Sequence, residues 1–110
     1  MTLVQRLNQA GVRASHFTRH DARGSVTIGF HLFDAQNPVP GKDTIAPGPN
    51  FGERVTAHCD AMDEAVCVRH GIAEKIVLVS HDDSFGVRLD VFNADRSDKA
   101  VWFPGWGQWH

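Results

Sequence analysis

The sequence contains no tyrosine, only two cysteines and no apolar run near the roughly 20 residues that a helix needs to cross a bilayer. Two cysteines are too few for the framework of a disulfide-stapled domain. A surplus of one charge is also lacking, since 11 basic and 13 acidic side chains give a net charge of −2. This balance provides no overall basic field for a phosphate backbone and too few charges for a disordered acidic tail.

What is present suits one ordinary globular domain over residues 1–110. The chain is 42% hydrophobic, and a chain of this mass buries about two-thirds of its surface on folding. Residues 1–6 lack the basic region, apolar core and cleavage site of a signal peptide. We therefore expect a cytoplasmic protein with no membrane segment.

The first part of the chain predicts a short helix and a hairpin. Thr2 and Gln5 have the spacing of a capping box at the start of a helix over 3–10. Apolar and polar residues alternate over 25–33, which predicts a half-buried strand that pairs with a preceding strand over 12–20.

Residues 34–50 form a segment with four prolines and two glycines, which excludes a regular helix or strand. Structureless loops longer than about 12–15 residues are uncommon in compact domains and are typically functional or disordered. This Pro/Gly loop, which includes Lys42 and Asp43, is therefore the first candidate for a contact surface.

A long helix is predicted over 51–70, with Asn50 and Glu53 as a second capping box. Its apolar side should pack on the sheet, and its polar side should face solvent. The apolar stripe consists of Phe51, Val55, Cys59, Met62 and Val66. The opposite side carries Thr56, Asp60, Asp63, Glu64 and Cys67.

Three strands are predicted after this helix. Residues 75–81 are apolar on both faces, as in a central strand, residues 87–92 alternate, and residues 100–103 form an edge strand. The element order is α-β-β-loop-α-β-β-β. It predicts an α+β fold with an antiparallel sheet of about five strands and both helices on one face.

The end of the chain gathers four large aromatic side chains around a Pro-Gly turn: Trp102, Phe103, Trp106 and Trp109. The aromatic tail over 104–110 either folds back over Phe33 and Phe92 or exposes an apolar patch of the kind that contacts another protein. The edge strand at 100–103 would also allow pairing with a partner strand, including that of a second copy in a homodimer.

No local motif predicts catalysis. Ser80, His81 and Asp82 are contiguous, so their side chains diverge, and Asp82 and Asp83 are expected to be solvated in a turn. We therefore expect no catalytic residue and no cofactor.

The strongest metal candidate is the set Asp63, Cys67 and His70, at i, i+4 and i+7 on the long helix. It defines a first alternative function, a zinc-binding enzyme or module. Structural zinc sites usually draw ligand pairs from two elements, which argues against this set. His16 and His20 lie about 13 Å apart if their segment is a strand, which is too far for shared chelation.

A second alternative is a nucleic-acid-binding regulator. Its basis is a cluster of arginines in the first quarter of the chain: Arg6, Arg13, Arg19 and Arg23. Without an interleaved set of aromatic stacking residues, such a cluster is more typical of a solvated face.

The pattern as a whole favours a small, non-enzymatic domain that binds another protein through the Pro/Gly loop and the aromatic tail. Size and charge alone suggest, by analogy, an inhibitor or immunity-type protein of a phage, plasmid or bacterium. The expected contact residues are Trp102, Phe103, Trp106, Trp109, Lys42 and Asp43.

Overall fold

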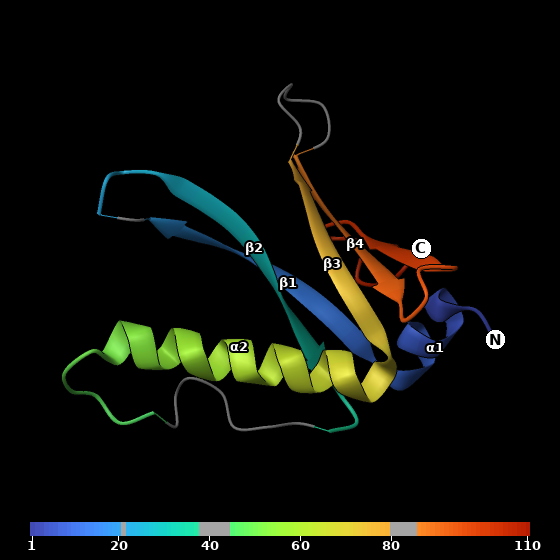
Figure 1. The fold of residues 1–110 in the computed structure, drawn as a ribbon, viewed down its shortest axis with the longest axis horizontal. Coiled ribbons are helices and arrows are strands. Elements are labelled where there is room, and N and C mark those ends of the chain that lie inside the picture. The colour runs from blue at the N-terminus through green and yellow to red at the C-terminus, as the bar shows by residue number, and fades with distance from the viewer. Residues whose placement is uncertain (21, 38–44, 80–85) are drawn as a thin grey trace.

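The computed structural model describes residues 1–20, 22–37, 45–79 and 86–110 and contains two helices and five strands (Figure 1). In chain order they are α1 (Leu3–Ala10), β1 (Val12–His20), β2 (Val26–Asp34), α2 (Phe51–His70), β3 (Ile72–Val79), β4 (Val87–Asn93) and β5 (Lys99–Trp102). The α+β class and the element order are confirmed. Neither helix is long and apolar enough to cross a membrane, as far as the described residues go.

The two helices begin differently. At α1 the Thr2 hydroxyl accepts a hydrogen bond from the Gln5 amide, and the Gln5 side chain accepts one from the Thr2 amide, so this capping box is confirmed. At α2 the predicted capping box is wrong. Asn50 has a left-handed backbone with φ 57°, and its side chain makes no capping hydrogen bond. An N-cap needs an extended backbone to aim its side chain at the first turn, which Asn50 lacks.

The five strands divide between two antiparallel sheets. β1 pairs with β2 in an uninterrupted register from Val12 opposite Asp34 to His20 opposite Val26. The other sheet has the order β3-β4-β5. β4 is therefore the central strand, and β3, which the apolar run predicted to be central, lies at an edge.

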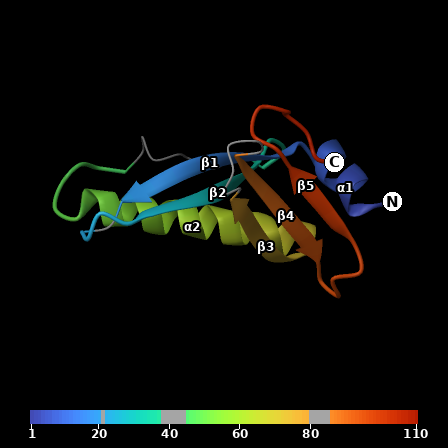
Figure 2. The same ribbon diagram turned by 90° about the horizontal axis from the view of Figure 1, so that it is seen from above.

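The molecule has a packed end and a projecting arm (Figures 1 and 2). α2 runs beneath the β1–β2 hairpin, whereas α1, β4, β5 and both termini gather at the other end. We call the far half of the hairpin and the first half of α2, residues 15–29 and 51–62, the arm. None of the described residues in the arm is buried.

The core lies at the packed end, where both sheets and both helices meet. Its buried side chains are Leu3, Leu7, Val12, Ala14, Phe30, Leu32, Val66, Ile72, Leu89, Val91, Ala100, Trp102 and Trp109.

This position of the core changes the predicted faces of α2. Of the apolar stripe only Val66 is buried, and Phe51 is 41% exposed because the first half of the helix extends past the core. Asp63, which we expected on the solvent side, is buried beside β2.

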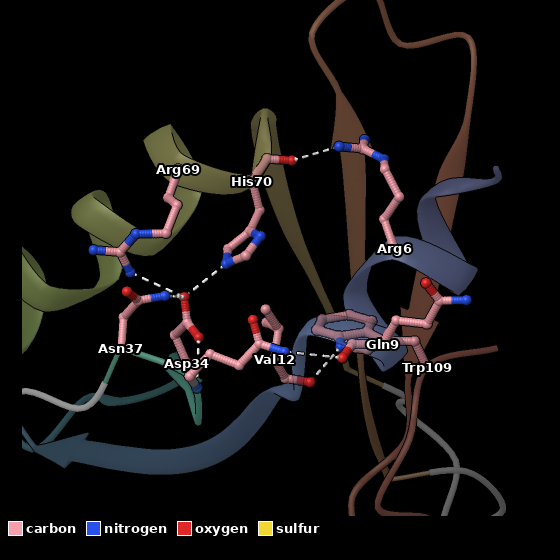
Figure 3. Close-up of polar contacts among 9 residues, drawn as sticks. Arg6, Gln9, Val12, Asp34, Asn37, Arg69, His70 and Trp109 are labelled. Carbon is pink, nitrogen blue, oxygen red and sulfur yellow. Dashed lines mark hydrogen bonds and ion pairs between the residues drawn. The ribbon is translucent and has the colours of Figure 1, made fainter.

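The aromatic tail docks against the core by inserting Trp109. The Trp109 indole is 1% exposed, contacts the Trp102 ring at a centroid distance of 5.1 Å, and donates from Nε1 to the Val12 carbonyl at 2.9 Å (Figure 3). The Asn8 side chain accepts from the Trp109 amide at 2.8 Å and donates to its carbonyl at 3.0 Å. The prediction that the aromatic tail covers Phe33 is wrong, because Phe33 is 45% exposed.

The tail also occupies part of the edge at which we expected a partner strand. Val101 and His110 exchange two backbone hydrogen bonds of 2.9 Å each. The outer edge of β5 is therefore partly paired within the chain, which leaves less backbone for a homodimer at residues 100–103.

Trp109→Ala should lower the free energy of unfolding by about 3–5 kcal/mol, because it removes a buried indole and leaves a cavity. Trp106→Ala is the matched control, since the Trp106 ring is 58% exposed, and it should change stability by less than about 0.5 kcal/mol. Urea unfolding of both variants measures the difference. Equal stabilities of the two variants would contradict the docking of Trp109.

Candidate functional site

The structure separates the predicted contact residues into two groups. Trp102 and Trp109 are in the core, at 5% and 1% exposure, so neither is available to a partner. Trp106 is exposed, and Phe103 is half-buried. Lys42 and Asp43 lie outside the described residues, as do Ser80 to Asp83.

The sheet β3-β4-β5 has one face on the core and one face turned away from both helices. Leu89, Val91 and Ala100 point to the core, and Lys75 of β3 reaches Asp63 of α2 on the same side. Side chains alternate along a strand, so their neighbours point to the opposite side. This outer face carries the apolar residues Ile76, Leu78, Phe92 and Val101.

Three rings extend the outer face beyond β5. Phe103 follows the inward-pointing Trp102, and His110 is paired with the outward-pointing Val101, so both rings lie on the outer side. The Trp106 ring packs on both, with centroid distances of 4.4 Å to Phe103 and 4.5 Å to His110. We call these three residues the aromatic cluster.

A buried carboxylate lies in the middle of the outer face. Asp90 is 5% exposed and receives two hydrogen bonds from Arg88, Nε to Oδ1 at 2.9 Å and Nη2 to Oδ2 at 3.2 Å. Lys99 Nζ lies 3.8 Å from Asp90 Oδ2. Two cations against one anion leave the centre of this face with a surplus positive charge.

A second buried carboxylate joins β2 to the last turn of α2 (Figure 3). Asp34 Oδ2 accepts from Arg69 Nη1 at 2.9 Å and from His70 Nε2 at 2.7 Å, and Asn37 and the Gln36 amide also donate to this carboxylate. Burial alone would raise the pKa of Asp34. The hydrogen bonds from His70, Arg69, Asn37 and Gln36 outweigh burial and hold that pKa well below its usual range.

The predicted metal ligands are held by separate partners. The Asp63 carboxylate accepts from the Leu32 amide at 2.9 Å and pairs with Lys75, whereas His70 binds Asp34. Burial and the neighbouring Glu64 raise the pKa of the Cys67 thiol, which disfavours the thiolate that a metal requires. Among the described residues no group of three or more His, Cys, Asp or Glu is placed to hold a metal ion.

The other predicted clusters are also dispersed. His16 and His20 lie on β1, as the alternation predicted, so they do not chelate together. Arg6 donates to the His70 carbonyl, Arg13 to the Gly107 carbonyl, and Arg19 to Asp60. These arginines are distributed from α1 to the arm, and each binds a residue of another element instead of contributing to one basic patch.

A groove between α2 and β2 offers little room for a cofactor. Its volume is about 230 Å³, below the roughly 300–1,000 Å³ of typical ligand pockets. Its lining includes the apolar residues Leu32, Met62 and Val66 and the charged residue Arg69.

The burial of the carboxylates Asp34, Asp63 and Asp90 was not predicted from the sequence, although Asp63 was named as a candidate metal ligand. A signal existed for Asp34, because the alternation that buries Phe30 and Leu32 continues to residue 34 and places an acid on the core face. Arg69 and His70 are adjacent at the end of the predicted helix and were available as hydrogen-bond donors to this carboxylate.

Asp34 should make the free energy of unfolding decrease at acidic pH. Because folding lowers its pKa, the folded state favours the ionised carboxylate, so its contribution is complete above about pH 4 and decreases as the pH falls below that value. Asp34→Asn should lower the free energy of unfolding by about 1–3 kcal/mol at neutral pH and flatten its dependence on acid. Thermal unfolding from neutral to strongly acidic pH measures this, with Glu64→Gln as the exposed control. Parallel curves for wild type and Asp34→Asn would contradict the assignment.

No protein-family model, curated protein or solved structure matches this chain. Its function is therefore inferred from the geometry of the outer face and the buried charges. The Asp34 and Asp63 carboxylates are already held by partners within the fold. The outer face combines exposed Leu78 and Trp106 with half-buried apolar residues around the Asp90 charge group, so it is the better candidate for contact with another molecule.

Proposed function

We propose that this protein is a non-enzymatic module that binds another protein through the outer face of β3-β4-β5 and the adjoining aromatic cluster. The observation that carries the proposal is the position of Trp106. Its ring is 58% exposed and rests on Phe103 and His110, beside a sheet face that is turned away from both helices. Burial of such a ring by a partner would remove a large apolar area from water.

The composition of this face supports a protein as the occupant. Leu78 is 41% exposed, and Ile76, Phe92 and Val101 are half-buried around the Arg88–Asp90 pair. Contiguous exposed apolar surface rimmed by polar groups is typical of protein contacts. Tryptophan and arginine are also the residues that most often dominate binding energy at such contacts.

The proposed contact set differs from the one that the sequence predicted. The proposed contact set keeps Phe103 and Trp106. In place of Trp102 and Trp109 it contains the apolar residues of the outer face, Ile76, Leu78, Phe92 and Val101. A contribution from Lys42 and Asp43 of the Pro/Gly loop stays a prediction. We propose, as narrower forms of the same function, a cytoplasmic location and an inhibitor or immunity-type role in which the outer face covers a partner's functional surface.

Trp106→Glu should abolish partner binding without unfolding the protein, because it replaces the exposed aromatic ring that a partner would bury with a charge. The measurement is affinity capture from a native lysate with quantitative mass spectrometry. Val68→Glu is the matched control, since Val68 is an apolar residue that is 77% exposed on α2, away from the outer face. A partner recovered with wild type and Val68→Glu but lost with Trp106→Glu supports the proposal. Equal recovery by all three proteins would refute it.

A further inference from the structure

Within the described part of the chain, the outer edge of β1 presents backbone groups that no other strand pairs, and one hydrogen bond shows which residues carry them. The Leu32 amide donates to Asp63 on the side of β2 that faces away from β1. Leu32 lies opposite Ala14, so Ala14 also directs its backbone groups away from its partner strand. Every second residue along β1 therefore directs its backbone N–H and C=O away from β2. Val12 belongs to this set, and its carbonyl accepts a hydrogen bond from the Trp109 indole N–H on the outer side.

Beyond Val12, the outward-directed backbone groups of β1 belong to Ala14, His16, Thr18 and His20. In the described part of the chain, no backbone hydrogen bond reaches these groups on the outer side. The register with β2 has no bulge, and β1 contains no proline, so two common protections of an edge strand are missing. The open edge is about 20 Å long, at about 3.3 Å per residue.

The arm to which this edge belongs is weakly packed. No described residue between positions 15 and 29 is buried, and the facing half of α2 buries none before Asp63. A two-stranded hairpin is marginally stable unless further strands or packing support it. An added strand would supply hydrogen bonds and side-chain contacts to a part of the fold in which no described residue is buried.

The charge of β1 identifies the kind of strand that fits. The strand carries Arg13, Arg19, His16 and His20 and no acidic residue. Arg13 Nη1 binds the Gly107 carbonyl, and Arg19 Nη2 lies 3.3 Å from Asp60 with its side chain 43% exposed, so each guanidinium keeps donors for another acceptor. A second copy of this chain would bring the same cations to the same edge and be repelled.

We propose that the β1 edge binds an extended acidic segment of another protein, which adds to the β1–β2 sheet as a third strand. Backbone hydrogen bonds at His16, Thr18 and His20 would hold the added strand. Carboxylates on alternate residues of the segment would pair with Arg13 and Arg19. The β1 edge and the outer face belong to different sheets, so either can fail while the other binds.

The probe is a short, end-blocked peptide that alternates glutamate with valine, and the control peptide has lysine in place of each glutamate. Backbone amide shifts of the unmodified protein are followed by NMR as each peptide is added. The glutamate peptide should shift the amides of His16, Thr18 and His20 and bind at least about tenfold more tightly than the lysine peptide. Equal affinities would overturn the proposal.

Thr18→Pro tests whether the backbone edge itself is used. It removes one outward N–H and spares the hydrogen bonds between β1 and β2, a position at which edge strands tolerate proline. Binding of the glutamate peptide should weaken by about tenfold or more, whereas Thr18→Ala, which keeps the N–H, should stay within about twofold of wild type. An unchanged affinity in Thr18→Pro would overturn the proposal. If Thr18→Pro does not fold, the comparison of the two peptides on the wild-type chain decides.

Two other occupants give distinct results. A second copy at this edge would appear as a dimer in light scattering of the wild-type chain that Thr18→Pro converts to monomer. A nucleic acid would appear as displacement of the glutamate peptide by a single-stranded oligonucleotide, with a steep loss at higher salt. Either result would overturn the assignment of an acidic protein segment.

Discussion

The buried indole of Trp109 is the contact on which the joining of the two sheets depends. In the residues that the structure describes, the sheets β1-β2 and β3-β4-β5 share no strand pairing, so side-chain contacts hold them together. Trp109 packs on Trp102 of β5, donates to Val12 of β1, and is held along its backbone by Asn8 of α1. One residue near the end of the chain therefore connects three elements, and the core forms around it.

Buried carboxylates extend this connection to α2. Asp63 joins the helix to the edge of β2 and to Lys75 of β3, and Asp34 joins the end of β2 to Arg69 and His70. A buried charge is costly without partners, so each aspartate favours the one arrangement in which its donors converge. These contacts fix the C-terminal half of α2, whereas the first half extends with the hairpin as the arm. Among the described residues, no backbone hydrogen bond is made at the outer edge of β1 beyond Val12, and the outer face lies away from both helices.

Local sequence signals predicted the local structure well. The capping box of Thr2 and Gln5 marked the start of α1, and the alternation before Phe33 marked the hairpin, because both patterns act within a few residues. The division into two sheets could not be predicted, since periodicity does not state which strands pair. β3 appeared central because both its faces are apolar, but one of those faces belongs to the exposed outer face.

The candidate site was only partly predictable for the same reason. The sequence identified an aromatic tail but not which rings it buries, because the docking of Trp109 depends on Asn8 and Val12, about a hundred residues away along the chain. The face that Asp63 occupies was assigned wrongly. Helical periodicity assigns polar residues to solvent, whereas Asp63 lies at the outer edge of β2, where its carboxylate accepts a hydrogen bond from the Leu32 amide.

Hydrogen exchange of the wild-type backbone tests most directly the claim that packing is concentrated around Trp109 and is weak in the arm. The amides of Leu89 and Val91 in the core strand should exchange only by global unfolding. The amides of Phe17 and Gly29, which pair β1 with β2 inside the arm, should exchange by local opening and at least about a hundredfold faster. Equal protection at both ends of the molecule would contradict the account.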